Sequence, residues 1–201
     1  MQFSDFLHPN IPLFITTFGY IGLCAIVFAE SGLFFGFFFP GDSLLFSAGL
    51  IASQGFFDIR VLATLIVVSA IAGDSVGYWF GAKVGPKIFT KEDSFFFNKR
   101  HIERTRLFYL KYGPRAVVLA RFIPVVRTLT PILAGVWNMP YLLFLRYNIV
   151  GGVAWGAGLT LLGYFLGAAI PGIEEYIVPI ALGIIVVSFL PIALEFYRAR
   201  K

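Results

Sequence analysis

Five ionisable side chains lie within or at the edge of long apolar stretches of this sequence. They are Glu30, Asp42, Asp74, Arg121 and Arg127. Each charge costs about 2.5–3.5 kcal/mol to insert into hydrocarbon, so several of them in one short chain need an explanation. They are either ion pairs that hold broken helices in place or a site that binds a substrate and takes up protons, and these two interpretations are compatible.

The two arginines flank Pro124 and suit an anionic group. A guanidinium stays charged and presents a planar fork that matches phosphate oxygens, so Arg121 and Arg127 could together hold a headgroup. The alternative is that each arginine pairs with Glu30 or Asp42. Three carboxylates and two guanidiniums sum to −1, and a bound phosphate adds negative charge that favours protonation of a nearby carboxylate. This predicts proton-coupled anion movement, in which Glu30 and Asp42 take up the protons.

Asp74 is expected to support the site rather than to carry protons. It stands beside a helical face with glycine at every fourth position, at Gly73, Gly77, Gly81 and Gly85. Because small residues let membrane helices approach closely, Asp74 is predicted to be a hydrogen-bond partner between helices. A second set of glycines is predicted to serve packing alone: Gly151, Gly152, Gly156 and Gly158. The aromatic residues Trp137, Tyr141 and Trp155 are interpreted as ordinary membrane aromatics.

The composition indicates a membrane protein. Of the 201 residues, 58% are hydrophobic and 13% are charged, whereas soluble domains average about 45–50% and about 25%. A helix crosses the bilayer core with roughly 20 apolar residues. Four stretches fit that length: 11–29, 61–82, 141–169 and 176–197. The predicted fold class is therefore an all-α integral membrane protein with about four transmembrane helices.

Two further apolar stretches, 31–57 and 116–139, contain helix breakers. These are Pro40 and Gly41 in the first stretch, and Pro124 and Pro131 in the second. Proline removes a helix donor, and broken backbone at membrane depth persists only where protein or a wet cavity surrounds it. Both stretches are therefore predicted to be re-entrant helical hairpins. Pro40, Gly41 and Pro124 are expected to support the site.

A short internal repeat divides the chain. Ala48-Gly49 recurs as Ala134-Gly135, and Gly77-Tyr78 recurs as Gly163-Tyr164, both 86 residues later. Each repeat is a hairpin followed by a span, and one crossing separates the two, so the second is inverted, as in many transporters. Within a single membrane domain, 1–201, we predict repeat 1 (31–82), a basic connection (83–115), repeat 2 (116–169), and a C-terminal span with a basic tail (176–201).

The basic connection orients the chain in the membrane. Nine of the 16 Lys and Arg residues lie within 83–115, and such clusters favour the cytoplasmic side. If the second hairpin is re-entrant, counting the crossings places both termini in the cytoplasm. Within the connection, Ser94 is predicted to cap an interfacial helix that ends at Tyr112, before Gly113-Pro114.

Several other function classes fit the sequence poorly. Cys24 is the sole cysteine, and His8 and His101 lie outside the apolar runs, so neither a metal site nor a cofactor is predicted. No nucleophile-elbow, P-loop or H-E-x-x-H pattern is present, and the chain is not expected to be an enzyme. No soluble module surrounds the basic block, so no nucleic-acid partner is predicted. A channel is not favoured, because no ring of like charges is visible.

Three spaced motifs combine in this chain. They are Glu30 followed by Phe39-Pro40-Gly41-Asp42-Ser43, then Gly73-Asp74-x-x-Gly77-Tyr78, then Arg121-Phe122-x-Pro124-x-x-Arg127 with Ala134-Gly135-x-x-x-Met139. Together they make the chain resemble the DedA family, whose membrane domain is also called the VTT or SNARE-associated domain. The resemblance implies two opposed re-entrant hairpins in a bacterial cytoplasmic (inner) membrane and the transport or scrambling of lipids.

The same resemblance implies links to undecaprenyl phosphate recycling, to phosphatidylethanolamine translocation and to tolerance of stress on the proton gradient. It also implies functional roles for Glu30, Asp42, Arg121 and Arg127. The expected function is thus that of a flippase or scramblase, with a phosphate-bearing headgroup on the arginines and protons on the two carboxylates. The expected partners are membrane lipids with anionic or phosphate-bearing headgroups, and protons.

Two alternatives stay open. The first is a proton-coupled exchanger of small cations, in which the carboxylates bind the ion and the arginines are structural. The second is a scaffold for membrane assembly that transports nothing. Lysine in place of Arg121 or Arg127 discriminates between lipid and cation transport, because a phosphate site needs the guanidinium fork. Assembly as a homo-oligomer also stays open.

Overall fold

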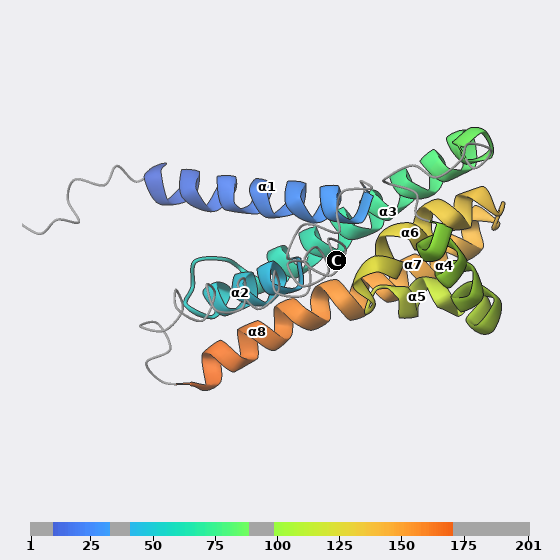
Figure 1. Cartoon of the computed structure of the whole chain (residues 1–201). Helices are drawn as coiled ribbons and strands as arrows, with labels where there is room; N and C mark the ends of the chain where they lie inside the picture. Colours follow the sequence, from blue (N-terminus) through green and yellow to red (C-terminus); the bar gives the residue numbers. More distant parts are fainter. Residues whose placement is uncertain (1–9, 33–40, 89–98, 171–201) are drawn as a thin grey trace, which may run out of the picture.

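The computed structural model describes residues 10–32, 41–88 and 99–170, and every regular element in these ranges is helical. The helices are shown in Figure 1: α1 (Asn10–Gly32), α2 (Gly41–Ser53), α3 (Ile59–Ile88), α4 (Lys99–Tyr112), the short η3 (Gly113–Arg115), α5 (Ala116–Ala120), α6 (Pro124–Val136), α7 (Tyr141–Gly152), η4 (Val153–Ala157) and α8 (Gly158–Ala169). The all-α expectation is confirmed for this part of the chain.

Among the described residues, two helices are long and apolar enough to cross a membrane. They are Ile59–Val84 within α3, and the continuous helix Tyr141–Ala169 formed by α7, η4 and α8. Both coincide with stretches that the sequence predicts as spans, as expected for a membrane protein. The stretch 176–197, the basic tail and both termini lie outside the described residues.

The ends of three elements show which sequence signals act on the backbone. Helix α1 passes the predicted end of the first span and continues through Glu30 to Gly32. Because glutamate is a good helix former, its charge ends the apolar run without ending the helix. Helix α2 begins at Gly41, while Pro40 lies outside the described residues. Helix α4 ends at Tyr112 as predicted, and Gly113 follows with a φ of +58°. Ser94, the expected cap of that helix, also lies outside the described residues.

The second apolar stretch with prolines is broken at one of its two prolines. Ile123 is extended, with φ −122° and ψ 107°, since a residue before proline is disfavoured in the helical region. Pro124 then opens α6 at a position where its missing N–H costs nothing. Pro131 lies inside α6 and does not end it. It faces Gly77 of α3, so α6 packs closely against α3 at this position.

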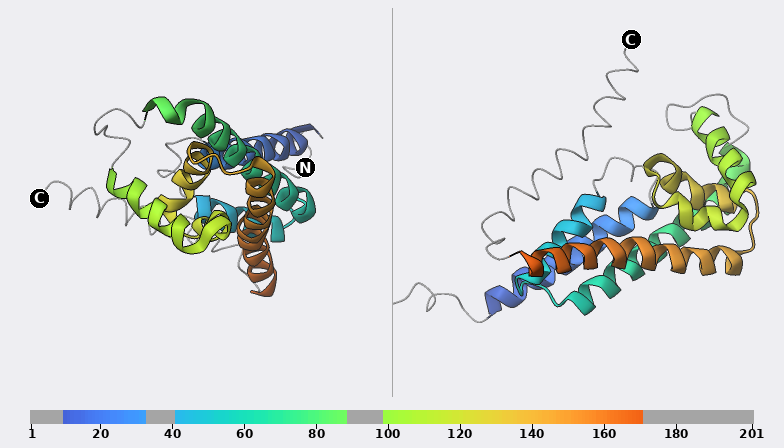
Figure 2. Two further views of the ribbon diagram at one scale, coloured as in Figure 1. Left: turned by 90° about the vertical axis from the view of Figure 1, so that its right-hand side faces the viewer. Right: turned by 90° about the horizontal axis from the view of Figure 1, so that it is seen from below.

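The helices that follow the two breaks pack against long helices of the opposite half of the chain. Helix α2 lies along α8, and α6 lies along α3, while α1 also packs on α3 (Figures 1 and 2). Glycines allow these approaches: Gly49 of α2 lies against the carbonyl oxygen of Thr160 in α8, and Gly135 of α6 lies against that of Tyr78 in α3. Gly49 and Gly135 are 86 residues apart, like the other sequence matches. Tyr78, however, matches Tyr164, which lies one helical turn beyond Thr160. Equivalent glycines therefore contact matching helices at positions one turn apart.

The glycines that the sequence predicts to serve packing divide into two groups. Gly73 lies against the α1 backbone, Gly81 against the backbone of Ile132, and Gly156 against Ile66, which confirms the packing interpretation at these positions. Gly158 differs, because a Cβ there would meet no atom within 4 Å. Gly158 is thus not needed for a close approach between the described helices.

Gly135→Ala should destabilise the fold. A Cβ at this position would overlap the carbonyl oxygen of Tyr78, and backbone cannot move aside as a flexible side chain can. Overpacking of this kind costs about 1–3 kcal/mol, which thermal unfolding of the detergent-purified protein would measure. Gly158→Ala is the matched control, since it is also a helical glycine and has open space around it. Equal unfolding temperatures for the two variants would contradict the contact.

Candidate functional site

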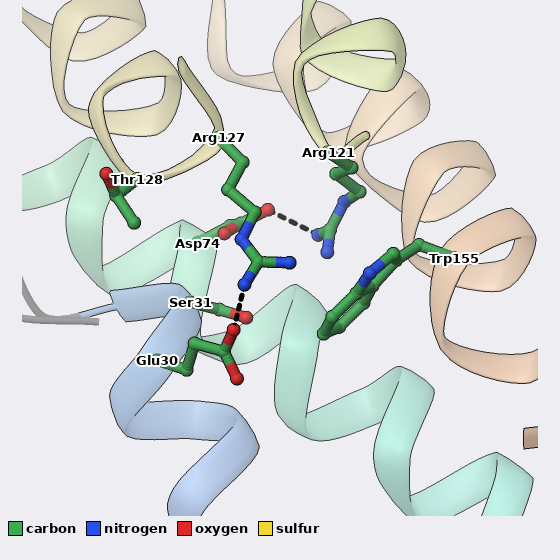
Figure 3. A pocket seen from close by; sticks show the side chains of 7 residues that line it. All are labelled: Glu30, Ser31, Asp74, Arg121, Arg127, Thr128 and Trp155. Atoms are coloured by element: carbon green, nitrogen blue, oxygen red, sulfur yellow. Dashed lines mark hydrogen bonds and ion pairs between the residues drawn. The ribbon is translucent and has the colours of Figure 1, made fainter. Parts of the chain in front are cut away.

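A small pocket lies between the end of α1, the turn before α6 and the middles of the two long helices. Its empty space, open mouth included, is about 270 Å³. It is lined by Glu30, Ser31, Asp74, Arg121, Arg127, Thr128 and Trp155 (Figure 3). Asp74 stands halfway along α3, and Trp155 stands halfway along Tyr141–Ala169. If these helices cross a bilayer, the pocket therefore lies near its midplane.

Arg127 is held between two carboxylates from different helices. One amino group, Nη2, donates to Glu30 at the end of α1, as Figure 3 shows. The other, Nη1, donates to Oδ1 of Asp42 in the first turn of α2, at 2.7 Å. The Glu30 side chain is 2% exposed, whereas that of Asp42 is 54% exposed. The guanidinium thus has one buried partner and one partner that is open to solvent.

The first turn of α2 lies directly on the Glu30 carboxylate. A Cβ at Gly41 would overlap the carboxylate atoms of Glu30, so the supporting role expected for Gly41 has a steric basis. The N-terminus of a helix also favours a nearby negative charge. Glu30 is therefore fixed by Arg127 on one side and by the start of α2 on the other.

Arg121 belongs to a second, more enclosed network. Its Nη2 donates to Asp74 and, at 2.6 Å, to the side-chain oxygen of Asn148. The Asn148 amide in turn donates to the backbone carbonyl of Ile71 at 3.1 Å. Gly151 provides the space for the arginine stem, because a Cβ there would lie 2.9 Å from Cδ of Arg121. Arg121 and Asp74 are both buried, which makes this pair a fixed clamp between helices.

The structure separates the predicted site residues into two ion-pair groups. Glu30, Asp42 and Arg127 come together as expected. The alternative in which Arg121 pairs with Glu30 or Asp42 is wrong, because the break before Pro124 places Arg121 beside the middle of α3, where it pairs with Asp74. The predicted role of Asp74 as an interhelical hydrogen-bond partner is confirmed by the same contact.

Two residues of the site, Trp155 and Asn148, are missed by the sequence analysis. Trp155 donates from Nε1 to Oδ1 of Asp42 at 2.8 Å, so its interpretation as an ordinary membrane aromatic is wrong. Membrane tryptophans concentrate at the two interfaces, and Trp155 stands instead in the middle of an apolar span. Asn148 is a buried amide in the same span. For both residues, a polar group in the middle of an apolar span was the sequence feature that could have identified them as part of the site.

Comparison with known proteins places this fold and site in a family. The VTT domain family matches residues 39–165 of the chain. The chain belongs to the VTT domain family. The protein DedA of Escherichia coli K12 is 40% identical over 184 residues, which cover 90% of this chain and 84% of DedA. This confirms the resemblance to the DedA family of membrane proteins that the motifs indicate.

Two further relatives of this VTT domain protein bear the name uncharacterized membrane protein. One from Mycobacterium leprae is 45% identical over 166 residues, which cover 83% of this chain and 74% of the relative. One from Mycobacterium tuberculosis H37Rv is 45% identical over 185 residues, which cover 90% and 81%. No solved structure matches the chain. The relatives therefore support membrane localisation and leave the transported substrate to be argued from the pocket.

Proposed function

We propose that this VTT domain protein moves a phosphate-bearing lipid between the leaflets of the bacterial cytoplasmic membrane, driven by proton uptake and without covalent chemistry. The observation that carries the proposal is Arg127, whose two amino groups bind one buried and one open carboxylate. A guanidinium whose carboxylate partner is exposed to solvent can exchange that carboxylate for another oxyanion. Phosphate oxygens match the planar pair of N–H donors that the guanidinium presents. Undecaprenyl phosphate and phosphatidylethanolamine are the lipids that the family resemblance favours.

The proposed arrangement in the membrane has four spans, with the breaks before α2 and α6 as re-entrant hairpins that enter from opposite faces. Both termini would face the cytoplasm. The packing of α2 on α8 and of α6 on α3 supports this arrangement, because each hairpin would then be braced by a span of the other half. The pocket would lie between the two hairpins, where a headgroup entering from either face could reach it.

The charges of the site suggest an order of events. An arriving phosphate first replaces Asp42, since Asp42 is the half-exposed partner of Arg127. The added negative charge then favours protonation of a carboxylate, and Glu30 is the one held beside the same guanidinium. Proton uptake and phosphate binding are thereby linked through Arg127. Release on the other side reverses both steps.

A leaflet-accessibility assay with purified protein in liposomes tests the function. We expect a labelled polyprenyl phosphate or phosphatidylethanolamine to change leaflet, and the same label on a glycosyl diacylglycerol, whose uncharged sugar headgroup carries no phosphate, to stay. A proton gradient should raise the rate for the phosphate-bearing lipid. Proton-driven flux of small cations with no movement of any tested lipid would overturn the proposal in favour of a cation exchanger.

Glu30→Gln should remove the dependence on the proton gradient in that assay. Glutamine keeps the shape of Glu30 and a hydrogen bond to Arg127 but takes up no proton. The initial rate with and without an imposed gradient is the measurement, and Asp42→Asn is the parallel variant. Unchanged coupling in both variants would refute proton uptake at these carboxylates.

The cation exchanger is less well supported by the geometry. It requires the carboxylates to be available to a cation, yet Glu30 and Asp42 both bind Arg127, and Asp74 binds Arg121. A small cation would first have to displace a guanidinium, and that of Arg127 has its carbon 5.3 Å from the centroid of the Trp155 ring. An anion has to replace only the half-exposed Asp42, because it binds the Arg127 guanidinium itself.

A further inference from the structure

We propose that Trp155 is a ligand-binding residue of this pocket, whose indole N–H and Arg127 together hold one phosphate oxygen in the place now taken by Asp42. This inference rests on the proposed function and extends it by adding a third donor to the phosphate site. None of the three motifs described above includes Trp155.

The argument begins with a shared acceptor. Oδ1 of Asp42 accepts from Nη1 of Arg127 at 2.7 Å and from Nε1 of Trp155 at 2.8 Å. Two donors from different helices therefore converge on one oxygen position. A carboxylate oxygen and a phosphate oxygen accept hydrogen bonds in the same way, so the Asp42 oxygen marks where a phosphate oxygen can lie.

The burial of the two partners is unequal. Trp155 is 3% exposed, and the Asp42 side chain is 54% exposed. If Asp42 turns outward, the indole N–H stays behind in a buried site without an acceptor. A buried donor without a partner costs about 1–3 kcal/mol, and the phosphate oxygen bound to Arg127 is the acceptor within reach. The tryptophan thus favours the exchange of Asp42 for phosphate.

The indole ring also lies close to both arginines. Its centroid lies 5.3 Å from the Arg127 guanidinium carbon and 5.8 Å from that of Arg121, and Figure 3 shows Trp155 beside both side chains. Cations within about 6 Å of a tryptophan face are attracted to it. The ring therefore keeps both guanidiniums near the pocket when their carboxylates are exchanged.

The backbone around Trp155 is built to place this side chain. Residues Val153–Ala157 form a short π-helix, a widened turn that occurs frequently at functional sites. On either side of Trp155, Gly152 and Gly156 lie against Ile71 and Ile66 of α3. The widened turn is thus held against α3, and the tryptophan it carries faces the pocket.

A purely structural role for Trp155 has to be tested as well, since the ring also packs in a hydrophobic cluster with Leu45, Leu62 and Ile66. Trp155→Phe keeps an aromatic ring there and removes the N–H. We expect this variant to stay folded and to need at least about tenfold more phosphate-bearing lipid for half-maximal movement, because hydrogen bonds to charged groups contribute about 1.5–3 kcal/mol. Trp79→Phe, at an exposed position on α3, should behave as the parent protein.

Fluorescence gives a second readout that packing alone would not change. In the double variant Trp79→Phe with Trp137→Phe, Trp155 is the remaining tryptophan of the chain. Its emission should shift and saturate on titration with a short-chain polyprenyl phosphate in detergent. The corresponding alcohol, which lacks the phosphate, should give no shift. Inorganic phosphate tests whether the headgroup alone is sufficient.

The outcomes separate this inference from the proposed function. The role of Trp155 would be overturned if Trp155→Phe needs the same half-maximal lipid concentration as the parent protein. It would also be overturned if the Trp155 emission does not change with the phosphate-bearing lipid although the protein moves that lipid. In both cases the proposed lipid movement itself would not be contradicted. A parent protein that moves no phosphate-bearing lipid would overturn both. A raised half-maximal concentration at an unchanged unfolding temperature, together with a saturable shift, is the expected result.

Discussion

Arg127→Lys should slow lipid movement by about 10–100-fold while the protein stays folded. Lysine keeps the positive charge, so Glu30 retains a counter-ion in its buried position. A single ammonium cannot reproduce two fixed donors aimed at two carboxylates, nor present a planar fork to phosphate. The lost hydrogen bond to a charged group is worth about 1.5–3 kcal/mol, which corresponds to the stated range. Initial rates in the leaflet assay measure the effect.

Arg60→Lys is the matched control for this variant. Arg60 is exposed near the start of α3, away from the pocket residues, and its replacement should leave the rate unchanged. Wild-type lipid movement in Arg127→Lys would mean that charge alone is needed at this position, and the phosphate fork would have to be abandoned. Cation flux that survives the same substitution would favour the exchanger.

Asp74→Ala should destabilise the protein by about 3–5 kcal/mol. It leaves Arg121 buried and charged with Asn148 as its remaining described side-chain hydrogen-bond partner, and removing one member of a buried ion pair typically costs this much. Unfolding in detergent by heat or denaturant is the measurement. Asp58→Ala is the comparison, because Asp58 accepts from the amides of Arg60 and Val61 at the start of α3, where loss of a cap costs only about 1 kcal/mol.

The double variant Asp74→Leu with Arg121→Met separates stability from function. Replacing both members of a buried ion pair by apolar residues of similar volume is often neutral or stabilising. We therefore expect the double variant to recover most of the stability that Asp74→Ala loses. Lipid movement should stay low, since one of the two proposed phosphate-binding guanidiniums is gone. If the loss of stability in the double variant equals the sum of the losses in Asp74→Leu and Arg121→Met alone, the pairing of these two residues would be contradicted.

The sequence predicts well the features that depend on local chemistry. Pro124 ends one helical segment and opens the next, Gly81 marks a close approach, and charges in apolar stretches mark the pocket. Each of these follows from a property of one residue in any environment. The span predicted at 141–169 is likewise helical throughout, because its length and composition are sufficient to specify a long helix.

The pairing of the charges could not be predicted in the same way. Three carboxylates and two arginines allow several pairings, and the one that forms depends on which helices become neighbours. Arg121 lies beside Asp74 only because the turn before Pro124 meets the middle of α3. Trp155 was missed for a related reason: its role depends on Asp42, which comes from a helix more than a hundred residues earlier in the chain.

All three carboxylates that pair with Arg121 and Arg127 lie in the first half of the chain, whereas both arginines lie in the second. During synthesis, the ribosome therefore releases Glu30, Asp42 and Asp74 well before their counter-ions exist. Until Arg121 and Arg127 emerge, these acids need water, protons or an insertion factor to tolerate the lipid environment. A chain that is truncated between the two halves would keep these carboxylates without their counter-ions. The unpaired acids at membrane depth would then distinguish truncated chains from complete ones for the proteases and chaperones of the cell.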